Sequence, residues 1–336
     1  MKNNHKIKKV VAVVGATGAV GVEILKILER RRFPMAKLIL LASERSEGKT
    51  ITFKKKKIKV RRLTEDSFKG VDIALFSAGS SVSERYAPIA VKSGAVVVDN
   101  TSAFRMDPSV PLVVPEINPE DLKWHRGIIA NPNCSTIQMV LVLKPIHERF
   151  KIKRVIVSTY QSVSGAGQSA INALLNESML KLSGTKVKKH VMHHPIAFNV
   201  IPQIDLFLSD GYTKEELKMM NETKKILHDD SFKLTATCVR VPVLRGHSEA
   251  VNIETEKQFT ISEIKKELSK MKNLVIEDSP EERLYPMPIH AEGRFDTFVG
   301  RIRKDSTVPH GLNCWIVSDN LLKGAAFNAV QIAELL

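Results

Sequence analysis

The chain is poor in cysteine and has no long apolar run. Its three cysteines, Cys134, Cys238 and Cys314, are an odd and widely spaced set among 336 residues. Such a set forms no disulfide framework and contains no CxxC metal-binding pair, so we expect free thiols in a reducing compartment and no metal site. No stretch reaches the roughly 18 consecutive apolar residues of a membrane-spanning helix. These absences predict a cytoplasmic protein that does not enter a membrane.

We expect neither a secretion signal nor a nucleic-acid partner. The basic start of the chain leads into an apolar run at residues 10–15, which is too short for a signal-peptide core and ends in a glycine motif. The net charge is +15, but the cations are spread out and lack interleaved aromatic residues. We interpret the densest run, residues 54–57, as the exposed turn of a hairpin. The charge is compatible with anionic substrates but does not establish them.

The first part of the chain alternates short apolar strands with amphipathic helices. Strands are expected at residues 8–14, 38–41, 73–76 and 95–99, with helices beginning at Val20 and around residues 83–93. This alternation predicts a doubly wound parallel sheet. After about residue 133 the elements lengthen and predict a mixed α+β domain, with strands at 155–160, 235–241 and 250–254 and a helix at 214–227. A last apolar helix is expected over residues 320–336.

A glycine-rich turn, GATGAVG at residues 15–21, follows the first predicted strand at once. Glycines let a pyrophosphate approach backbone amides at a helix N-terminus, where the helix dipole favours an anion. A lone glycine motif is weak evidence and can be a structural turn. Its place between a buried strand and an amphipathic helix predicts a dinucleotide site. We expect the cofactor to contact five residues of the turn: Gly15, Thr17, Gly18, Ala19 and Val20.

The residues after the second predicted strand bear on which nucleotide binds, and they point both ways. Glu44 is suited to accept hydrogen bonds from the ribose hydroxyls of NAD. Arg45 and Ser46 are suited to a 2′-phosphate, because a guanidinium binds phosphate oxygens in a bidentate way. We favour NADP(H), and Glu44 leaves NAD as the alternative.

Cys134 stands where a reactive thiol is expected. The segment Asn131-Pro132-Asn133 marks a turn before an apolar helical stretch at residues 137–143. Cys134 would therefore lie near a helix N-terminus, where the dipole favours thiolate over thiol and lowers a pKa of ordinarily about 8.5. Cys238 and Cys314 lie inside β-type runs, and we interpret both as buried core residues.

A thiol nucleophile needs a base, and His247 is the candidate among ten histidines. It follows Gly246, which permits close backbone approach, and Arg240 stands on the preceding strand. A structural histidine is an equally good interpretation from sequence alone. We interpret the adjacent pair His193-His194, before a proline, as part of a loop. If Arg245 pointed inward, it would lower the pKa of His247 by like-charge repulsion. We expect Arg245 to point to solvent.

Taken together, four motifs resemble the aspartate-semialdehyde dehydrogenase family. They are GATGAVG at 15–21, NPNCST at 131–136, QSVSGAG at 161–167 and RVPVLRGHSE at 240–249. The similarity runs nearly end to end and includes GYTKEELK at 211–218 and SDNLLKGAA at 318–326. It implies an α/β fold with a Rossmann-type dinucleotide-binding domain over residues 1–133, completed by the C-terminal helix at 320–336. Residues 134–319 would form an α+β catalytic and dimerisation domain.

The resemblance also implies a role for each site residue. Cys134 resembles the nucleophile, Gln161 the residue that orients the substrate, and His247 the general acid/base. The substrate contacts would be Arg240 on the α-carboxylate, Glu215 on the amino group, Arg105 and Lys218 on phosphate, and Asn133. Further cofactor contacts would be Ser164 and Gly165, in a loop of small residues beside the nicotinamide, and Asn320.

The activity implied by the resemblance is NADPH-dependent reductive dephosphorylation of L-aspartyl 4-phosphate to L-aspartate 4-semialdehyde through a cysteine thioester. This step belongs to lysine, diaminopimelate, methionine and threonine biosynthesis, and the family implies a homodimer. N-acetyl-γ-glutamyl-phosphate reductase and glyceraldehyde-3-phosphate dehydrogenase share the plan, but the Arg240-to-His247 spacing and the QSVSGAG loop favour the aspartate enzyme. A nucleotide-sensing or nucleic-acid-binding protein without catalysis is the alternative from another class, and the presence of every expected catalytic residue argues against it.

Overall fold

The chain folds into two compact units. The computed structural model describes residues 8–185 and 191–336. The first unit comprises Met1–Pro132 and Ala325–Leu336, and the second comprises Asn133–Gly324. The chain therefore passes from one unit to the other twice, just before Asn133 and just after Gly324. Within the described ranges, no helix is long and apolar enough to cross a membrane.

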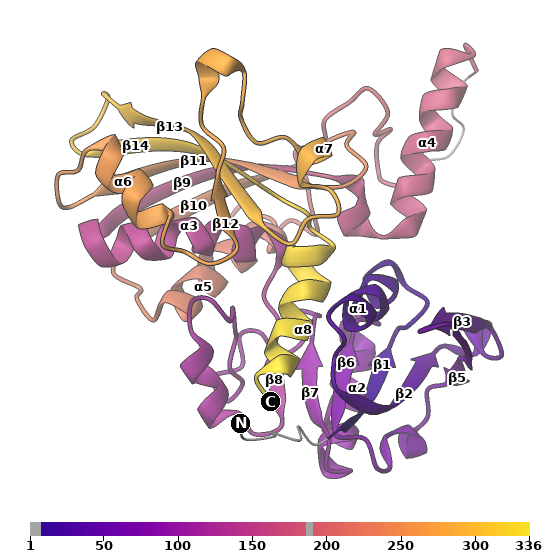
Figure 1. Cartoon of the computed structure of the whole chain (residues 1–336). Helices are drawn as coiled ribbons and strands as arrows, with labels where there is room; N and C mark the ends of the chain where they lie inside the picture. Colours follow the sequence, from indigo (N-terminus) through magenta and orange to yellow (C-terminus); the bar gives the residue numbers. More distant parts are fainter. Residues whose placement is uncertain (1–7, 186–190) are drawn as a thin grey trace. The chain divides into compact units, whose positions relative to one another are not determined.

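A six-stranded sheet forms the centre of the first unit (Figure 1). Its order is β5-β2-β1-β6-β7-β8, and every neighbouring pair is parallel. This is the strand order of a Rossmann-type sheet, so the predicted doubly wound fold is confirmed. The strands are β1 (Lys9–Val14), β2 (Met35–Ala42), β5 (Arg61–Arg62), β6 (Ile73–Phe76), β7 (Val96–Asp99) and β8 (Ile128–Ala130).

Helices cover the sheet of the first unit, which is why its central strand is apolar from Val10 to Val14. In β1, residues 11–14 are completely buried, as a parallel strand covered on both faces requires. Helix α1 contacts β1, α2 contacts β7, and α8 contacts both α1 and β7. The helices are α1 (Ala19–Arg30), α2 (Ser80–Lys92), α8 (Phe327–Glu334), and the short 3₁₀ helices η1 (Glu44–Ser46), η2 (Glu65–Phe68) and η3 (Pro119–Trp124).

The lysine-rich run forms the predicted hairpin. Strands β3 (Thr50–Phe53) and β4 (Lys56–Lys59) pair antiparallel across Lys54 and Lys55. Both turn residues have positive φ, 47° and 65°, the backbone of the tight turn whose twist matches a two-residue hairpin. The run is therefore a local structural feature with exposed charges.

A mixed six-stranded sheet, in the order β10-β9-β11-β14-β13-β12, forms the centre of the second unit (Figure 1). The outer pairs β10–β9 and β13–β12 are parallel, and the inner pairs are antiparallel. Helices α3, α5 and α6 contact this sheet. The strands are β9 (Ile152–Gln161), β10 (Lys233–Arg240), β11 (His247–Thr255), β12 (Leu274–Ile276), β13 (Thr297–Asp305) and β14 (Gly311–Ser318). The helices are α3 (Cys134–Phe150), α4 (Gln168–Leu182), α5 (Lys214–Leu227), α6 (Ile261–Leu268), α7 (Pro288–Ala291), η4 (Val163–Ala166) and η5 (Pro280–Glu282).

The ends of four strands, β9, β10, β11 and β14, meet at one edge of this second sheet. The parallel strands β9 and β10 end together, with Gln161 opposite Arg240. Strand β11 runs the other way and begins at this edge with His247, which pairs with Ser318 at the end of β14. The sheet register therefore pairs residues that lie 79 positions apart (Gln161 and Arg240) and 71 positions apart (His247 and Ser318) in the sequence.

The single helix expected over residues 320–336 is wrong in its first part. A turn follows β14, then a π-helical segment, η6 (Leu322–Ala326), and only then α8 begins. Apolar periodicity continues through both helical forms and does not reveal the change between them. The π-helical segment contains Gly324, where the second unit ends.

Candidate active site

Cys134 is the first residue of helix α3, and local sequence explains why the helix begins there. The side-chain Oδ1 of Asn133 caps the helix by accepting hydrogen bonds from the backbone N–H groups of Ser135 (3.0 Å) and Thr136 (3.3 Å). A Cβ on Gly324 would lie 2.8 Å from the Cβ of Cys134, so the π-helical segment packs against this residue and needs glycine. Cys134 is half-buried, forms no disulfide and lies at the positive end of a helix dipole.

Glu215 collects three predicted site residues around its buried carboxylate. The side-chain amides of Asn133 and Gln161 donate to Oε1, at 2.8 and 3.1 Å. Lys218 donates to Oε2 at 3.2 Å and also pairs with Asp205 at 2.7 Å. Burial raises the pKa of Glu215, but the Lys218 charge and the amide hydrogen bonds outweigh it and hold the pKa below its ordinary value. Glu215 is therefore a buried, charged anion.

Two further carboxylates support this cluster, and sequence reasoning missed both. Glu222 of α5 accepts the backbone N–H of Asn133 at 2.6 Å. Glu216 closes a capping box with Thr213 at the start of α5 and also accepts the backbone N–H of Cys238 at 2.9 Å. The T-x-x-E pattern that signals this cap is visible in the sequence, but the contact of Glu222 with Asn133 spans 89 positions and leaves no local signal.

Arg240 ends strand β10 inside the site. Its backbone pairs with Ile201 in both directions at 2.9 Å, and its Nη1 donates to the Ser162 carbonyl at 2.7 Å. Burial lowers the pKa of this guanidinium, while Glu215 and then Cys134 raise it by their negative charge. Arg240 therefore interacts electrostatically with both the carboxylate of Glu215 and the thiol of Cys134.

His247 is completely buried at the start of β11. Its Nδ1 accepts the backbone N–H of Ser162 at 3.0 Å, and its Nε2 has no hydrogen-bond partner among the described residues. Burial and the charge of Arg240 lower the pKa of His247 well below 6.5, with a smaller opposing effect of the Gly246 backbone. A Cβ on Gly165 would lie 3.1 Å from Arg240 Nη1 and 3.2 Å from His247 Nε2, so the loop passes close to both side chains.

Asn320 links the loop after β9 to the turn before His247. Its Oδ1 accepts hydrogen bonds from the hydroxyls of Ser162 and Ser164, both at 3.1 Å, and from the backbone N–H of Gly246 at 2.9 Å. All four residues belong to the second unit. Asn320 and Ser164, predicted from the family resemblance as cofactor contacts, thus lie together beside His247.

The expectation that Arg245 points to solvent is wrong. Its Nε donates to Asp319 Oδ2 at 2.8 Å, and Asp319 is completely buried. The same carboxylate accepts the backbone N–H of Gly293 at 2.8 Å. Because Asp319 neutralises Arg245, the cation that lowers the pKa of His247 is Arg240 instead. Asp319 adjoins Asn320 in the sequence, but its pairing with Arg245 has no local signal.

The glycine turn of the first unit is shaped for backbone contacts. Gly15 has φ +84°, and a Cβ there would lie 2.8 Å from the Ser77 carbonyl oxygen. A Cβ on Gly21 would lie 2.1 Å from the Gly15 carbonyl oxygen, so both positions exclude a side chain. Gly18 is the N-cap of α1, and in the described part of the chain no side chain caps this helix. The amides around Ala19 and Val20 are therefore suited to bind an anion.

The predicted nucleotide-specificity residues lie next to this turn. The Thr17 hydroxyl donates to Ser46 Oγ at 3.2 Å, which joins the glycine turn to the end of β2. Arg45 is exposed. Glu44, the residue that favours NAD, is exposed and pairs with Arg62 at 3.0 Å. Thr17 and Ser46 are therefore in contact, Arg45 is exposed, and Glu44 is paired with a cation, Arg62.

Arg105 lies in the first unit, almost completely buried. Its Nε donates to the Asn131 carbonyl at 2.9 Å, and its Nη2 donates to the Asn100 carbonyl at 2.8 Å. These bonds hold the guanidinium between two loops at the ends of β7 and β8. The sequence analysis did not predict that the Arg105 guanidinium is bonded to backbone carbonyls.

The remaining sulfur and histidine candidates do not form a site. Cys238 and Cys314 are buried free thiols, and burial raises the pKa of both, that of Cys314 to about 12. This agrees with the interpretation that both are core residues. His193 and His194 are exposed in a bend. Among the residues that the structure describes, no group of three or more His, Cys, Asp and Glu side chains could hold a metal ion.

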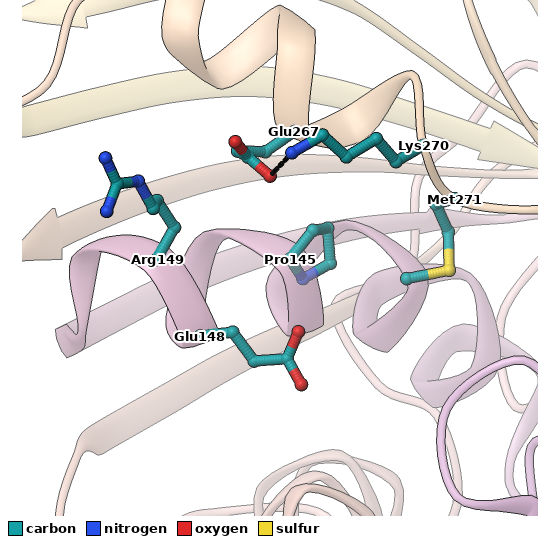
Figure 2. A pocket seen from close by; sticks show the side chains of 6 residues that line it. All are labelled: Pro145, Glu148, Arg149, Glu267, Lys270 and Met271. Atoms are coloured by element: carbon teal, nitrogen blue, oxygen red, sulfur yellow. Dashed lines mark hydrogen bonds and ion pairs between the residues drawn. The ribbon is translucent and has the colours of Figure 1, made fainter.

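A separate surface cavity of about 270 Å³ lies between α3 and the end of α6 (Figure 2). Its lining includes one ion pair, Glu267–Lys270 at 2.5 Å. None of the predicted site residues lines it; its wall consists of Pro145, Glu148, Arg149, Glu267, Lys270 and Met271.

Comparison with known proteins covers both units. The family description "Semialdehyde dehydrogenase, NAD binding domain" matches residues 10–125, and "Semialdehyde dehydrogenase, dimerisation domain" matches residues 143–323. The aspartate-semialdehyde dehydrogenase of Aquifex aeolicus is 58% identical over 330 residues, which cover 97% of each chain. The chain belongs to the aspartate-semialdehyde dehydrogenase family.

Solved structures of aspartate-semialdehyde dehydrogenases extend the similarity to three dimensions. A Vibrio cholerae enzyme, aspartate semialdehyde dehydrogenase II complexed with ASA, is 48% identical and superimposes with a TM-score of 0.96 over 98% of both chains. The enzyme from Candida albicans, solved with NADP, is 26% identical with a TM-score of 0.75 over 98% of both chains. The aspartate-semialdehyde dehydrogenase fold therefore accounts for essentially the whole chain.

Proposed function

We propose that the chain is an NADP-dependent aspartate-semialdehyde dehydrogenase, an oxidoreductase that converts L-aspartyl 4-phosphate to L-aspartate 4-semialdehyde. The observation that carries this proposal is the cluster at one edge of the second sheet. There, a thiol at a helix N-terminus shares a buried site with a guanidinium, a buried imidazole and a charged carboxylate. Family membership and the ASA-bound relative support the substrate. This step serves lysine, diaminopimelate, methionine and threonine biosynthesis.

The charges of the site suit the two ends of an amino-acid substrate. Arg240 would bind the α-carboxylate, because a guanidinium matches a carboxylate in a bidentate way. Glu215 would bind the amino group, because it keeps its charge despite burial. Lys218 would bind phosphate, and Arg105 is the second cation that we assign to it. Gln161 would orient the reacting carbonyl through the amide that now donates to Glu215.

Cys134 would attack the acyl-phosphate carbon. A C–S bond forms, the bond from carbon to the phosphate oxygen breaks, and phosphate leaves with that electron pair. Splitting the reduction through a thioester replaces one difficult step with two accessible steps. Bound NADPH would supply the hydride that reduces the thioester. The C–S bond then breaks, the aldehyde is released, and the electron pair returns to the Cys134 sulfur. His247 would be the general acid/base beside the reacting oxygen in both steps.

The first unit fits the nucleotide. The residues that would hold its phosphates are the backbone amides of Gly15, Gly18, Ala19 and Val20 together with Thr17, since a Cβ at Gly15 or Gly21 would collide with backbone. Arg45 and Ser46 would hold the 2′-phosphate. The pairing of Glu44 with Arg62 and the NADP-bound Candida albicans relative support NADP over NAD. Ser164, Gly165 and Asn320 would lie along the nicotinamide.

We further propose that the two units have different functions. Residues 1–133 with the C-terminal helix would bind NADP(H), and residues 134–319 would carry catalysis and dimerisation. The description of the family region at residues 143–323 as a dimerisation domain supports a homodimer. The three free thiols support a reducing compartment such as the cytoplasm.

The test is the phosphate-dependent formation of NADPH from L-aspartate 4-semialdehyde and NADP⁺, followed by its absorbance. NAD⁺ and glyceraldehyde 3-phosphate are run in parallel, with Cys134→Ala as the blank and Arg45→Ala as a specificity variant. We expect turnover only with the semialdehyde, abolished by Cys134→Ala. Arg45→Ala is expected to raise the KM for NADP⁺ and leave that for NAD⁺ unchanged.

A folded wild-type protein without turnover would contradict the assigned substrate. The same result with activity on glyceraldehyde 3-phosphate or on N-acetyl-γ-glutamyl phosphate would transfer the proposal to that acyl-phosphate enzyme. Near-normal turnover of Cys134→Ser would contradict the covalent scheme.

A further inference from the structure

The start of helix α3 is capped by two side chains that come from distant parts of the chain. The Oδ1 of Asn133 accepts the backbone N–H groups of Ser135 and Thr136, at 3.0 and 3.3 Å. The backbone N–H of Asn133 itself donates to Glu222 Oε2 at 2.6 Å, across 89 sequence positions. N–H groups at a helix start have no partner within the helix and need one from outside it. Glu222 of α5 therefore supplies one half of the cap of α3.

In helices α5 and α6 the corresponding acceptor is local. In a capping box, a Glu at the third helical position bonds the N–H of the cap residue. Thr213 and Glu216 form such a box in α5, and Thr260 and Glu263 form one in α6. The third position of α3 is Thr136, whose buried hydroxyl has no hydrogen-bond partner in residues 8–185 and 191–336. Helix α3 thus takes from α5 the acceptor that α5 and α6 each take from their own first turn.

Glu222 is almost completely buried on the face of α5 that carries the proposed substrate contacts. Positions 215, 218 and 222 follow one another at intervals of three and four residues, which places them on one side of a helix. Glu215 is the proposed contact of the substrate amino group, and Lys218 is that of phosphate. Helices α3 and α5 pack against each other (Figure 1). One face of α5 therefore bears both the substrate contacts and the acceptor that holds the start of α3.

Asn133 is bonded to α5 at two separate points. Its side-chain amide donates to Glu215 Oε1 at 2.8 Å, and its backbone N–H donates to Glu222. These two carboxylates come from positions about 10 Å apart along the axis of α5. Cys134 is the next residue in the chain, so the start of α3 cannot slide or turn relative to α5 without breaking one of these bonds. The position of the thiol is thereby set relative to Glu215 and Lys218.

We propose that Glu222 is a positioning residue for the nucleophile: through the peptide N–H of Asn133 it holds Cys134 in register with the substrate-binding face of α5. The inference rests on the proposed function of the site. Glu222 acts through its reach to Asn133 and not through contact with the substrate. Attack on a bound carbonyl depends on close alignment, and a misplacement of about 1 Å costs up to about 100-fold in rate. Loss of this bond therefore slows the attack of Cys134 on the substrate.

Two substitutions separate the reach of Glu222 from its charge. Glu222→Asp keeps the carboxylate but shortens the side chain, so the bond to Asn133 is lost. Glu222→Gln keeps the length and an acceptor oxygen for the Asn133 N–H. Thr223→Val is the matched control, because the buried Thr223 hydroxyl donates within α5 itself, to the Met219 carbonyl at 2.6 Å. This control perturbs the same turn of the same helix and leaves the bond to Asn133 intact.

Hydrogen exchange followed by mass spectrometry reads the bond without any turnover. We expect peptides that cover the start of α3 to exchange faster in Glu222→Asp than in the wild type, because the cap is lost. The same peptides should exchange at the wild-type rate in Glu222→Gln and in Thr223→Val. Unchanged exchange in Glu222→Asp would overturn the proposal.

The second readout is the burst of NADPH formed from saturating L-aspartate 4-semialdehyde and NADP⁺ without phosphate. The reaction then stops at the thioester, so the burst rate reports attack by Cys134 and hydride transfer. We expect Glu222→Asp to slow the burst about 10- to 100-fold, with Glu222→Gln and Thr223→Val close to the wild type.

Equal burst rates of Glu222→Asp and the wild type would overturn the positioning role. A burst about tenfold slower in Glu222→Gln would overturn it as well, whether or not Glu222→Asp folds, because charge and not reach would then matter. A wild-type protein without turnover would instead contradict the proposed function, since the exchange pattern does not depend on turnover.

Discussion

Glu215 and His247 belong to the same buried site, and burial disfavours the charged form of both. The neighbouring groups decide which charge state each side chain adopts. Lys218 and two side-chain amides keep the carboxylate charged, whereas Arg240 adds to the effect of burial and keeps the imidazole neutral. One buried site thus holds a carboxylate whose charged form is favoured and an imidazole whose charged form is disfavoured. Pairs of groups whose charge states are set apart in this way are typical of active sites.

The lowered pKa of Glu215 makes a stability prediction with a definite sign. Because the pKa in the folded state lies below the ordinary 4.5, the stabilisation is present above about pH 4.5 and is lost as the pH falls through the folded value. We expect Glu215→Gln to be less stable than wild type at pH 7, with a gap that narrows on acidification. Urea unfolding at neutral and acid pH measures this gap. The exposed substitution Glu292→Gln is the control, and a gap that widens in acid would contradict the argument.

Gly165→Ala tests how closely the loop must approach the site. The added methyl would press on Arg240 Nη1 at 3.1 Å and on His247 Nε2 at 3.2 Å. Both are far ends of side chains, so the fold should adjust while the catalytic geometry shifts. We expect kcat to fall about tenfold or more with little change in melting temperature. The control is Ser169→Ala, which is exposed on α4. Unchanged turnover of Gly165→Ala would show that the loop can accept a methyl group without disturbing Arg240 or His247.

At the scale of elements, the residues that cap the starts of helices α3 and α5 are also bonded to, or adjacent to, Glu215 of the candidate site. Asn133 caps α3 with one side-chain atom and donates to Glu215 with another. A single residue therefore sets where the helix begins and how the neighbouring anion is bonded. The capping box at Thr213 and Glu216 fixes the start of α5 in the same way, one residue from Glu215.

The two functions of Asn133 can be separated by substitution. Asn133→Ser keeps an acceptor for the cap and removes the donor to Glu215, whereas Asn133→Ala removes both. We expect Asn133→Ala to cost about 1 kcal/mol more in unfolding free energy than Asn133→Ser. Both variants should show a raised KM for the semialdehyde, because Glu215 loses a hydrogen bond. Equal stabilities of the two variants, measured by chemical denaturation, would contradict the capping role.

Local patterns predicted the elements well and their partners poorly. Residues 73–76 and 214–227 form the expected strand and helix with the expected ends, because apolar patterning and a cap mark them. The π-helical segment was not predicted, because its apolar spacing is the same as that of the helix it replaces. Glu222, Asp205 and Asp319 were missed as partners of site residues, because each contact joins positions far apart or depends on a turn after β14. The roles of Cys134, His247 and Gln161 stay predictions until the assays above are made.

For the whole molecule, the second sheet has one face covered by helices and one face that retains apolar side chains at the surface. Ile156 and Tyr160 of β9 are 38% and 40% exposed, and Tyr160 packs against Trp315 of β14 with ring centroids 5.2 Å apart. This exposed face lies within the region that matches the dimerisation domain. An exposed apolar sheet face is typical of a subunit interface.

We therefore expect Ile156→Glu to weaken the dimer. A charge on each copy of the face would be desolvated and would meet its like across a two-fold axis. Sedimentation velocity should show the wild type near twice the 37.5 kDa chain mass and the variant shifted toward a single chain. Lys57→Glu, on the hairpin of the first unit, is the control. A variant that stays dimeric at low concentration would place the interface on another surface.

The late position of Gly324 in the chain has a consequence for biosynthesis on the ribosome. Cys134 emerges early, but the glycine that packs against it and strand β14, which joins β11 to β13, lie much later, at residues 311–324. Helix α8, which completes the first unit, comes later still. A nascent or prematurely terminated chain therefore exposes its thiol before any substrate pocket surrounds it. The site around Cys134 is therefore complete only once the chain through Gly324 has been made, and products truncated before it should be inactive and vulnerable to oxidation and degradation.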